Sequence, residues 1–398
     1  MSASHRSHDE SVLRGYSGRI FIAITLCWAG LQFGRGVIPP LLPTIMEDLA
    51  ITPFLAGIAL SMLMVGNAAF QYLGGRFADA WTRKTVLAIS MAVLIGGLAV
   101  LLGALTYPPF LLGVTLVGIA SGLFFVPMRA ALADVFVSHR GRAYGLNEGV
   151  GAVAVVLASG TAAVLLLGTT WRLAFVPAVV VVLVGLVVLH RWQREDYVVG
   201  RAEIQLRHAV RGLAADRYLL LLLAGYCLVV FSMQGAFGFL PALLQAERGF
   251  SPSLASVAYA MLYVTGAVGM PVAGTLSDRG DRLALAVVVT TLAAFGVAMM
   301  LLSTHTVLVF LAIVLFAAGI LGFPPIVQSH LMDVFPDATM ARDFGAFKTV
   351  YIGAGGLGPT YVGFVAGHWG YEPAFWGLAA CLVLSASIVG VVWVRTGR

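Results

Sequence analysis

The chain has 398 residues, of which 60% are hydrophobic and 11% are charged, and its formal net charge is +6. A soluble globular domain carries roughly 25% charged residues, so this composition excludes an ordinary water-soluble fold and indicates an integral membrane protein. The positive charge does not indicate nucleic-acid binding, because the arginines lie in short loops between apolar runs.

Twelve apolar segments, each near the length of about 20 residues that a spanning helix needs, follow one another along the chain. In the first half they are residues 20–42, 54–74, 85–106, 110–137, 143–167 and 172–190. In the second half they are residues 218–243, 253–274, 283–303, 306–334, 344–367 and 372–394. Strands of a β-barrel would be about 10 residues long with alternating polarity, so we predict an all-α membrane protein with twelve transmembrane helices.

The loops predict the orientation of these helices. Basic residues gather before the first segment, in the 2–3, 4–5, 8–9 and 10–11 loops and at the C-terminus, as Arg6, Arg14, Arg19, Arg76, Arg83, Lys84, Arg140, Arg142, Arg279, Arg282, Arg342, Arg395 and Arg398. The polar segment 191–217 adds six arginines, whereas the opposite loops hold Glu47, Asp48, Glu247 and Glu372. The positive-inside rule therefore places both termini in the cytoplasm of a cell membrane.

The two halves of the chain repeat. "RAYGLNEGVGA" from Arg142 matches "RDFGAFKTVYIGA" from Arg342, and "ADVF" ending at Phe136 matches "MDVF" ending at Phe335. Each half has an even number of segments, so both halves insert with the same orientation and can be related by an axis along the membrane normal, as in transporters. We predict a six-helix bundle at 1–190, a cytoplasmic linker at 191–217 and a second bundle at 218–398.

A loop motif is similar to that of a known family. The 2–3 loop, "GGRFADAWTRKT", resembles the G-R-L-A-D-R-x-G-R-R signature of the major facilitator superfamily, and the 8–9 loop, "GTLSDRGDRL", is a second copy. The matching positions are Gly75, Asp79, Arg83 and Lys84 in the first loop and Gly274, Asp278, Arg279 and Arg282 in the second. The resemblance implies two six-helix bundles that rock about a central site.

The chemistry of this motif suggests a cytoplasmic latch. Asp79 and Asp278 can sit at a helix N-terminus, which favours a carboxylate, and neighbouring arginines can bridge to them. Asp134 and Asp333 lie near the cytoplasmic ends of the fourth and tenth segments, and we assign them to the same latch. The alternative is a structural loop that faces anionic lipid.

Charges at membrane depth are functional candidates, because each costs about 2.5 kcal/mol or more unless it faces a cavity or a partner. Arg35 lies 16 residues beyond Arg19, or about 24 Å into the membrane. It suits an anionic substrate group, and the alternative is a hydrogen bond to carbonyls near Pro39 and Pro40. This stretch also resembles the organic-anion (anion:cation) symporter branch, whose Asp-Arg pair stands here as Gly34-Arg35. The resemblance therefore implies anion binding without implying proton coupling at this position.

Three further charges lie in the predicted spans. Arg129 binds substrate or pairs with Glu148, and both alternatives stay open. Glu148 and Lys348 occupy equivalent positions of the repeat, with opposite signs. We predict that they form a cytoplasmic gate between the bundles; the alternative is that both reach the headgroups. If Glu148 and Lys348 do not pair, Lys348 is a candidate for a second cation that binds the substrate.

Polar residues complete the candidate set. Gln32 and Gln234 occupy equivalent positions of the repeat and are included as substrate-binding candidates. His330 is either a proton relay or an interior histidine with a local partner. No cysteine pair has CxxC spacing, so we expect neither a metal site nor a cofactor.

These features favour a secondary transporter, expected as a monomer, that moves a small organic anion, such as a carboxylate, by proton-coupled symport with Glu148 as the titrating group. A multidrug or metabolite exporter of the same superfamily is the alternative, although the fifth segment lacks the Gly-Pro motif of drug/proton antiporters. A membrane enzyme is not indicated, because no HExxH, nucleophile elbow or paired DxxxD is present. A transporter-like receptor is disfavoured by the short loops.

Overall fold

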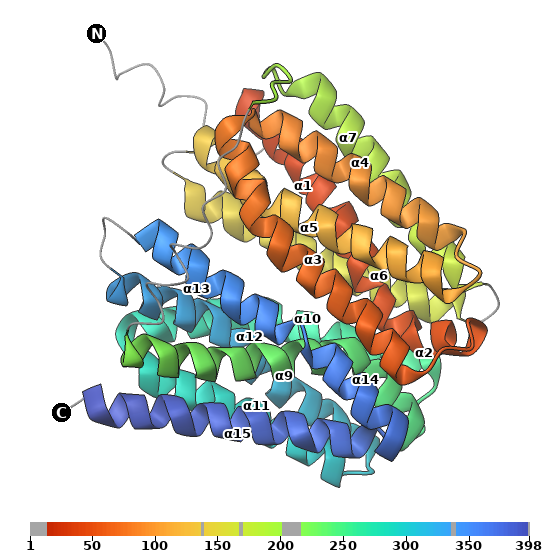
Figure 1. Ribbon diagram of the computed structural model, residues 1–398, viewed down its shortest axis with the longest axis vertical. Helices are drawn as coiled ribbons and strands as arrows, with labels where there is room; N and C mark the ends of the chain where they lie inside the picture. Colours follow the sequence, from red (N-terminus) through yellow and green to blue (C-terminus); the bar gives the residue numbers. More distant parts are fainter. Residues whose placement is uncertain (1–13, 137–138, 167–169, 201–215, 336–339, 397–398) are drawn as a thin grey trace. The chain divides into compact units, whose positions relative to one another are not determined.

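The computed structural model describes residues 14–136, 139–166, 170–200, 216–335 and 340–396. Every regular element in these ranges is a helix (Figure 1), which confirms the predicted all-α fold. Ten helices are long and apolar enough to cross a membrane, and the bent pair at the N-terminus makes an eleventh candidate. The predicted loop arginines Arg6, Arg201, Arg207, Arg211 and Arg398 lie outside the described residues.

The helices follow the predicted segments in order. They are α1 (Gly15–Gly36), α2 (Ile38–Asp48), α3 (Pro53–Ala80), α4 (Arg83–Leu102), α5 (Tyr107–Val135), α6 (Arg140–Leu165), the 3-10 turn η1 (Trp171–Phe175) and α7 (Val176–Trp192) in the first half. In the second half they are α9 (Arg217–Arg248), α10 (Pro252–Arg279), α11 (Arg282–Leu302), α12 (Thr306–Val334), α13 (Met340–Gly355), α14 (Gly358–Trp369) and α15 (Tyr371–Thr396).

Two predicted spans are broken helices. The first bends by 41° between α1 and α2, because Pro39 and Pro40 have no amide hydrogen to continue the ladder of α1. The eleventh divides into α13 and α14, each shorter than a full span. There Pro359 interrupts the ladder, and an added Cβ at Gly358 would collide with the carbonyl oxygen of Phe231 in α9. Only glycine permits this close approach.

The described residues group into two compact units. Unit 1 holds residues up to 38, 66–161 and 168–204, and unit 2 holds 39–65, 162–167 and residues from 205. This grouping differs from the predicted division at 190 and 218, because the first half of α3 packs in unit 2 against α14. Ser61 accepts hydrogen bonds from the amide and the hydroxyl of Thr360 at 3.1 and 2.7 Å.

Large apolar side chains fill the interior of each unit. Trp171, Phe110, Phe124, Phe136 and Phe175 are fully buried in unit 1, and Tyr226, Tyr259, Phe239, Phe316, Phe347 and Phe375 are fully buried in unit 2. These side chains fix how the helices of each unit pack.

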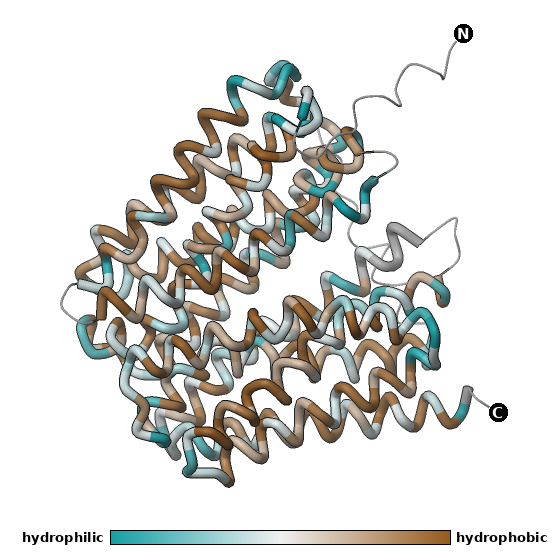
Figure 2. The backbone as a smooth tube through the Cα atoms, turned by 180° about the vertical axis from the view of Figure 1, so that it is seen from behind, coloured by the Kyte–Doolittle hydropathy of each residue, from teal (hydrophilic) through white to brown (hydrophobic). Residues whose placement is uncertain are grey.

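Apolar residues also cover outward faces of the helices. In α6, Leu146, Val150, Val153 and Leu157 are exposed at helical spacing, as expected for a face that contacts lipid. Figure 2 shows hydrophobic colour along the helices and hydrophilic colour gathered at many of their ends. The distribution is that of a membrane-spanning bundle.

Candidate functional site

An ion pair joins two of the membrane-depth candidates, Arg129 and Glu148, in unit 1. An Nη2 hydrogen of Arg129 in α5 is donated to Glu148 Oε1 in α6 at 3.0 Å, and the side chains are 35% and 43% exposed. Of the two alternatives for Arg129, the structure therefore shows the pairing. Since both side chains are partly exposed, the pair remains open to exchange with a ligand.

Aromatic residues hold the Arg129 guanidinium in place. Its carbon lies 4.5 Å from the ring centroid of Phe125 and 5.8 Å from that of Tyr144, within the range of cation–π attraction. The Tyr144 hydroxyl also donates to the Arg129 carbonyl oxygen at 2.9 Å. Sequence reasoning missed both aromatics, although each lies one helical turn from its charged neighbour: Phe125 before Arg129 and Tyr144 before Glu148.

The helix α1 packs beside this pair with a polar face. The Thr25 hydroxyl donates to Asn147 Oδ1 at 3.0 Å, and Asn147 is buried. Trp28 stacks on Phe124, with ring centroids 6.1 Å apart, and lies 6.0 Å from Phe125. Trp28, like the two aromatics above, is a neighbour of the site that sequence reasoning missed.

Arg35 lies in the last turn of α1, directly before the break. Its position at a helix C-terminus favours a cation, because the partial negative charge of the helix dipole lies at that end. Gln32 lies one turn earlier on α1. The predicted roles of both residues in substrate binding stay predictions.

The remaining central candidates lie in unit 2. Lys348 lies in α13 and is half-buried, and Gln234 in α9 directs its amide nitrogen at the sulfur of Met64. Glu148 belongs to unit 1 and Lys348 to unit 2, so their predicted gate stays a prediction. Within unit 1 the Glu148 carboxylate already has Arg129 as its partner.

The motif of unit 1 forms two surface ion pairs. Arg76 lies 3.9 Å from Asp79, and Arg83 Nε lies 3.4 Å from Asp134 Oδ2. We expected Asp79 and Asp278 at helix N-termini, but each lies near the C-terminus of its own helix. Asp79 lies in the last turn of α3, and the N-cap of α4 is Thr82, whose hydroxyl accepts the amide of Thr85. Thr82 fills the place because a hydroxyl caps equally well.

Lys84 is enclosed in this structure, and its assignment to the latch stays a prediction. Only 6% of Lys84 is exposed, and its ammonium donates to the Gln193 carbonyl oxygen at 2.7 Å. The same nitrogen lies 4.8 Å from the ring centroid of Tyr197. The physical reason is that residues 193–200, which follow α7, lie across the start of α4.

We call residues 193–200 the strap. Val198 donates its amide hydrogen to the Thr85 hydroxyl at 3.0 Å, and the indole of Trp81 donates to the Gly200 carbonyl at 2.6 Å. Glu195 accepts the amide hydrogen of Lys84 at 3.2 Å. Burial raises the pKa of the Tyr197 hydroxyl above its ordinary value, so it is neutral beside the ammonium. The strap satisfies a buried charge that would otherwise be costly.

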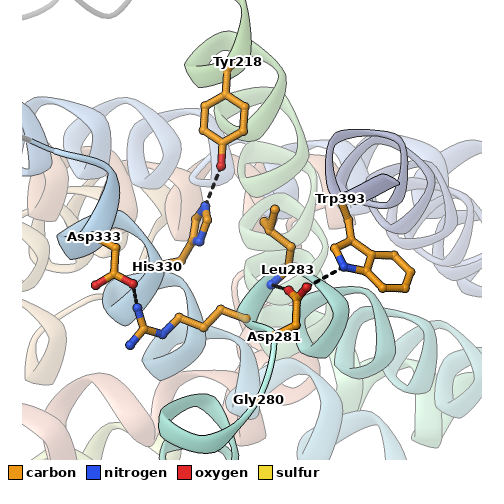
Figure 3. Close-up of a pocket in the computed structure, with 8 residues that line it drawn as sticks. Tyr218, Gly280, Asp281, Leu283, His330, Asp333 and Trp393 are labelled. Atoms are coloured by element: carbon orange, nitrogen blue, oxygen red, sulfur yellow. Dashed lines mark hydrogen bonds and ion pairs between the residues drawn. The ribbon is translucent and has the colours of Figure 1, made fainter. Parts of the chain in front are cut away.

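Unit 2 repeats the arginine–aspartate pair with other surroundings (Figure 3). Arg282 contacts Asp333, the counterparts of Arg83 and Asp134. Asp281 caps α11 by accepting the amides of Leu283 and Ala284 at 2.9 and 3.1 Å, and its second oxygen accepts the Trp393 indole at 2.7 Å. In contrast, Asp278 and Arg279 are exposed in the last turn of α10.

The pKa of Asp281 reflects these contacts. Burial alone would raise the pKa, but the amide of Ala284, the indole of Trp393 and the amide of Leu283 outweigh it, and the pKa of Asp281 lies below its ordinary value. The motif aspartate at the N-terminus of α11 is therefore Asp281 rather than the predicted Asp278. It stays ionised at neutral pH and fastens α15 to the start of α11.

His330 belongs to the same cluster around Arg282. It lies with Tyr218, Arg282 and Asp333 in the lining of a pocket of about 370 Å³. Its Nε2 is 2.9 Å from the Tyr218 hydroxyl (Figure 3). This local partner matches the alternative of a satisfied histidine, and the proton-relay role stays a prediction.

The motif glycines do not serve close helix packing. An added Cβ at Gly274 would meet nothing within 4 Å, and one at Gly75 would meet only the Val126 side chain, at 3.3 Å or more. The tight approach of α3 to α5 falls one residue earlier, at Gly74, where a Cβ would lie 2.9 Å from the Leu123 carbonyl oxygen.

An all-α chain with many apolar spans, a repeated arginine–aspartate pair and a half-buried ion pair at membrane depth belongs to the class of multi-span transporters. The family model of the Major Facilitator Superfamily matches residues 24–359. The chain therefore belongs to the major facilitator superfamily, and it is a membrane transporter.

Three relatives illustrate the similarity. The chain is 26% identical over 373 residues to the multi-drug resistance efflux pump PmrA of Streptococcus pneumoniae, covering 88% of this chain and 90% of that protein. It is 26% identical over 260 residues to a protein of Cupriavidus necator described as "Probable sulfoacetate transporter SauU", covering 60% and 59%. Its fold matches a bacterial homologue of the human lysosomal transporter Spinster with a TM-score of 0.74 and 17% identity over 95% and 96% of the two chains.

Proposed function

We propose that this transporter moves a small organic anion across the cell membrane by alternating access, coupled to protons in symport. The single observation that carries the proposal is the half-buried pair between Arg129 and Glu148, 3.0 Å apart. A guanidinium is an effective receptor for a carboxylate or sulfonate, and here an internal carboxylate, that of Glu148, occupies it.

The pair supports a simple coupling mechanism. An anionic substrate competes with Glu148 for the Arg129 guanidinium, because both are acceptors for the same donors. A displaced Glu148 carboxylate loses its positive neighbour, so its proton affinity rises. Substrate binding and proton binding therefore favour each other. This reciprocity is what symport requires.

The other candidates extend the site in this proposal. Arg35, at the end of α1, supplies a second cation, and Gln32 and Gln234 supply polar contacts from equivalent positions of the repeat. Lys348 either closes a gate with Glu148 or binds the substrate. In the gate hypothesis, Arg129 and Lys348 compete for Glu148.

Export is the second candidate function. Similarity to PmrA, an efflux pump, over 88% of this chain favours it, whereas similarity to SauU, a protein named for an organic sulfonate, favours anion transport. A guanidinium at membrane depth suits an anion better than the cationic or neutral apolar compounds that a broad exporter handles.

Coupling is tested with purified protein in proteoliposomes. Glu148→Gln mimics the protonated acid, so it is expected to bind and exchange anions across the membrane but not to accumulate them under a pH gradient. Arg129→Gln is expected to lose both activities. Arg172→Gln is the matched control. Arg172 donates a hydrogen bond to the Ala104 carbonyl oxygen at 2.8 Å and takes no part in the Arg129–Glu148 pair. If Glu148→Gln retains gradient-driven accumulation, proton coupling at this residue is wrong.

Orientation and assembly complete the proposal. We place both termini in the cytoplasm and expect a monomer. A reporter fused after Arg398 is expected to be active only as a cytoplasmic reporter. Activity of a periplasmic reporter at that position would contradict this orientation.

A further inference from the structure

We infer that the substrate carries a hydrogen-bond donor at the end opposite its anionic group, with an apolar section between them. This inference rests on the proposed anion transport and narrows its substrate class. It comes from two polar atoms of unit 1 that are buried and that have no hydrogen-bond partner among the described residues: Gln32 Oε1 and Arg129 Nε.

Unpaired buried polar atoms are costly. Each one forfeits roughly 1–3 kcal/mol relative to a satisfied group, so native proteins rarely keep them without a reason. Gln32 lies one turn after Trp28 on the same face of α1, and Trp28 contacts Phe125, which lies one turn before Arg129 on α5. Gln32 and Arg129 therefore both lie on the side of unit 1 where α1 meets α5.

The order of the atoms follows from the direction of the helices. Phe21 contacts Phe136, and Trp28 contacts Phe124, so α1 and α5 run antiparallel. Arg129 is thus level with about residue 25 of α1, next to Thr25, whereas Gln32 lies seven residues further along. Seven residues of helix span about 10 Å. The unpaired donor of Arg129 and the unpaired acceptor of Gln32 are separated by roughly this distance along the helix axis.

The atoms define what a complementary ligand contains. Arg129 Nε–H requires an acceptor, and Arg129 already favours an anion. Gln32 Oε1, assigned as the amide oxygen, requires a donor such as a hydroxyl or an ammonium group. The partly exposed ring of Phe125 and the indole of Trp28 lie between them. The indole nitrogen of Trp28 faces the backbone of Gly151 in α6. The Phe125 ring is therefore the surface against which an apolar section of the ligand would lie.

The test uses three matched probes with the intact purified transporter. The first is 3-(4-hydroxyphenyl)propionate, which has a carboxylate and a hydroxyl at opposite ends. The second is 3-phenylpropionate, which lacks the hydroxyl, and the third is 3-(4-hydroxyphenyl)propionamide, which lacks the charge. Dissociation constants are measured by calorimetry for wild type, Gln32→Leu, Arg129→Gln and Gln245→Leu. Gln245 is the control, because its amide nitrogen is also buried and unpaired among the described residues, but it lies on α9 of unit 2.

Wild type and Gln245→Leu are expected to bind the hydroxyl acid at least about tenfold more tightly than 3-phenylpropionate. Gln32→Leu is expected to reduce this ratio to about one while keeping the preference for acid over amide. Arg129→Gln is expected to lose the preference for acid over amide.

The outcomes separate the two hypotheses. If Gln32→Leu is stable and leaves the hydroxyl preference unchanged, or if none of the three probes binds while other carboxylates are transported, the donor inference is wrong and anion transport stands. If wild type binds the hydroxyl acid and the amide with equal affinity, and Arg129→Gln changes neither dissociation constant, the proposed anion site itself is wrong.

Discussion

The burial of Lys84 under the strap predicts that this motif lysine anchors residues 193–200 instead of acting in a surface latch. Lys84→Met keeps most of the apolar stem and removes only the ammonium. The substitution deletes the 2.7 Å hydrogen bond to the Gln193 carbonyl and the attraction to the Tyr197 ring. It should therefore loosen the strap without creating a large cavity.

The magnitude follows from these two contacts. A hydrogen bond from a charged group contributes about 1.5–3 kcal/mol, and the cation–π contact adds about 0.5–1 kcal/mol. Removing a buried ammonium also relieves its desolvation, which offsets part of the loss. We expect the strap to open more easily by about 1–3 kcal/mol, or roughly 5- to 150-fold in the open population.

Amide hydrogen exchange measures this opening directly. The Val198 amide is bonded to Thr85, so exchange in peptides covering 193–200 should accelerate by that factor in Lys84→Met. Arg83→Met is the matched control, because Arg83 forms an exposed pair with Asp134 and such pairs contribute about 0–1 kcal/mol. If exchange in the strap is the same in both variants and transport falls equally, Lys84 acts in the latch and the anchoring hypothesis is wrong.

Three further predictions concern charge. Arg35→Gln should abolish anion binding at normal protein levels and Arg35→Lys should weaken it, because lysine lacks the planar fork; normal binding by Arg35→Gln would remove Arg35 from the site. For the gate, the exchange Glu148→Lys with Lys348→Glu should restore part of the transport that either single change loses, and strictly additive losses would exclude the pair. Hydrogen bonds lower the pKa of Asp281, so its contribution to stability is lost as pH falls below about 4. Below that pH the melting temperature of Asp281→Asn should vary less with pH than that of the wild type. The same dependence of melting temperature on pH in both proteins would refute this prediction.

Hydropathy and proline placement allowed the spans to be predicted. The run at 306–334 coincides with α12 (Thr306–Val334), because a membrane helix must satisfy all of its backbone polar groups internally. The breaks in the helices lie at proline and glycine residues. The presence of a proline does not by itself predict a break, because Pro241 lies inside α9 without ending it.

The partners of charged residues were harder to predict. The repeat predicts equal depth for Glu148 and Lys348, but it does not say which face of α6 meets α5. This face decides that Arg129 contacts Glu148. Lys84 presents the same difficulty, because its neighbour Arg83 is also basic and the sequence does not distinguish the exposed cation from the buried one. Lys84 is the buried cation because its ammonium donates to the carbonyl oxygen of Gln193, a contact about 110 positions away along the chain.

The two copies of the motif show how one architecture is fastened by opposite charges. In unit 1 a buried cation, Lys84, is bound by Gln193 just after α7. In unit 2 the counterpart of Lys84 is Leu283, and an anion, Asp281, is bound instead by Trp393 near the end of α15. The segment that ends each half therefore fastens the motif loop. In unit 2 the central group is the Asp281 carboxylate, whereas in unit 1 it is the Lys84 ammonium, with the Glu195 carboxylate accepting only the Lys84 amide. Protonation of Asp281 removes the charge that accepts the Trp393 indole, so acid should loosen the contact between α15 and the start of α11 in unit 2.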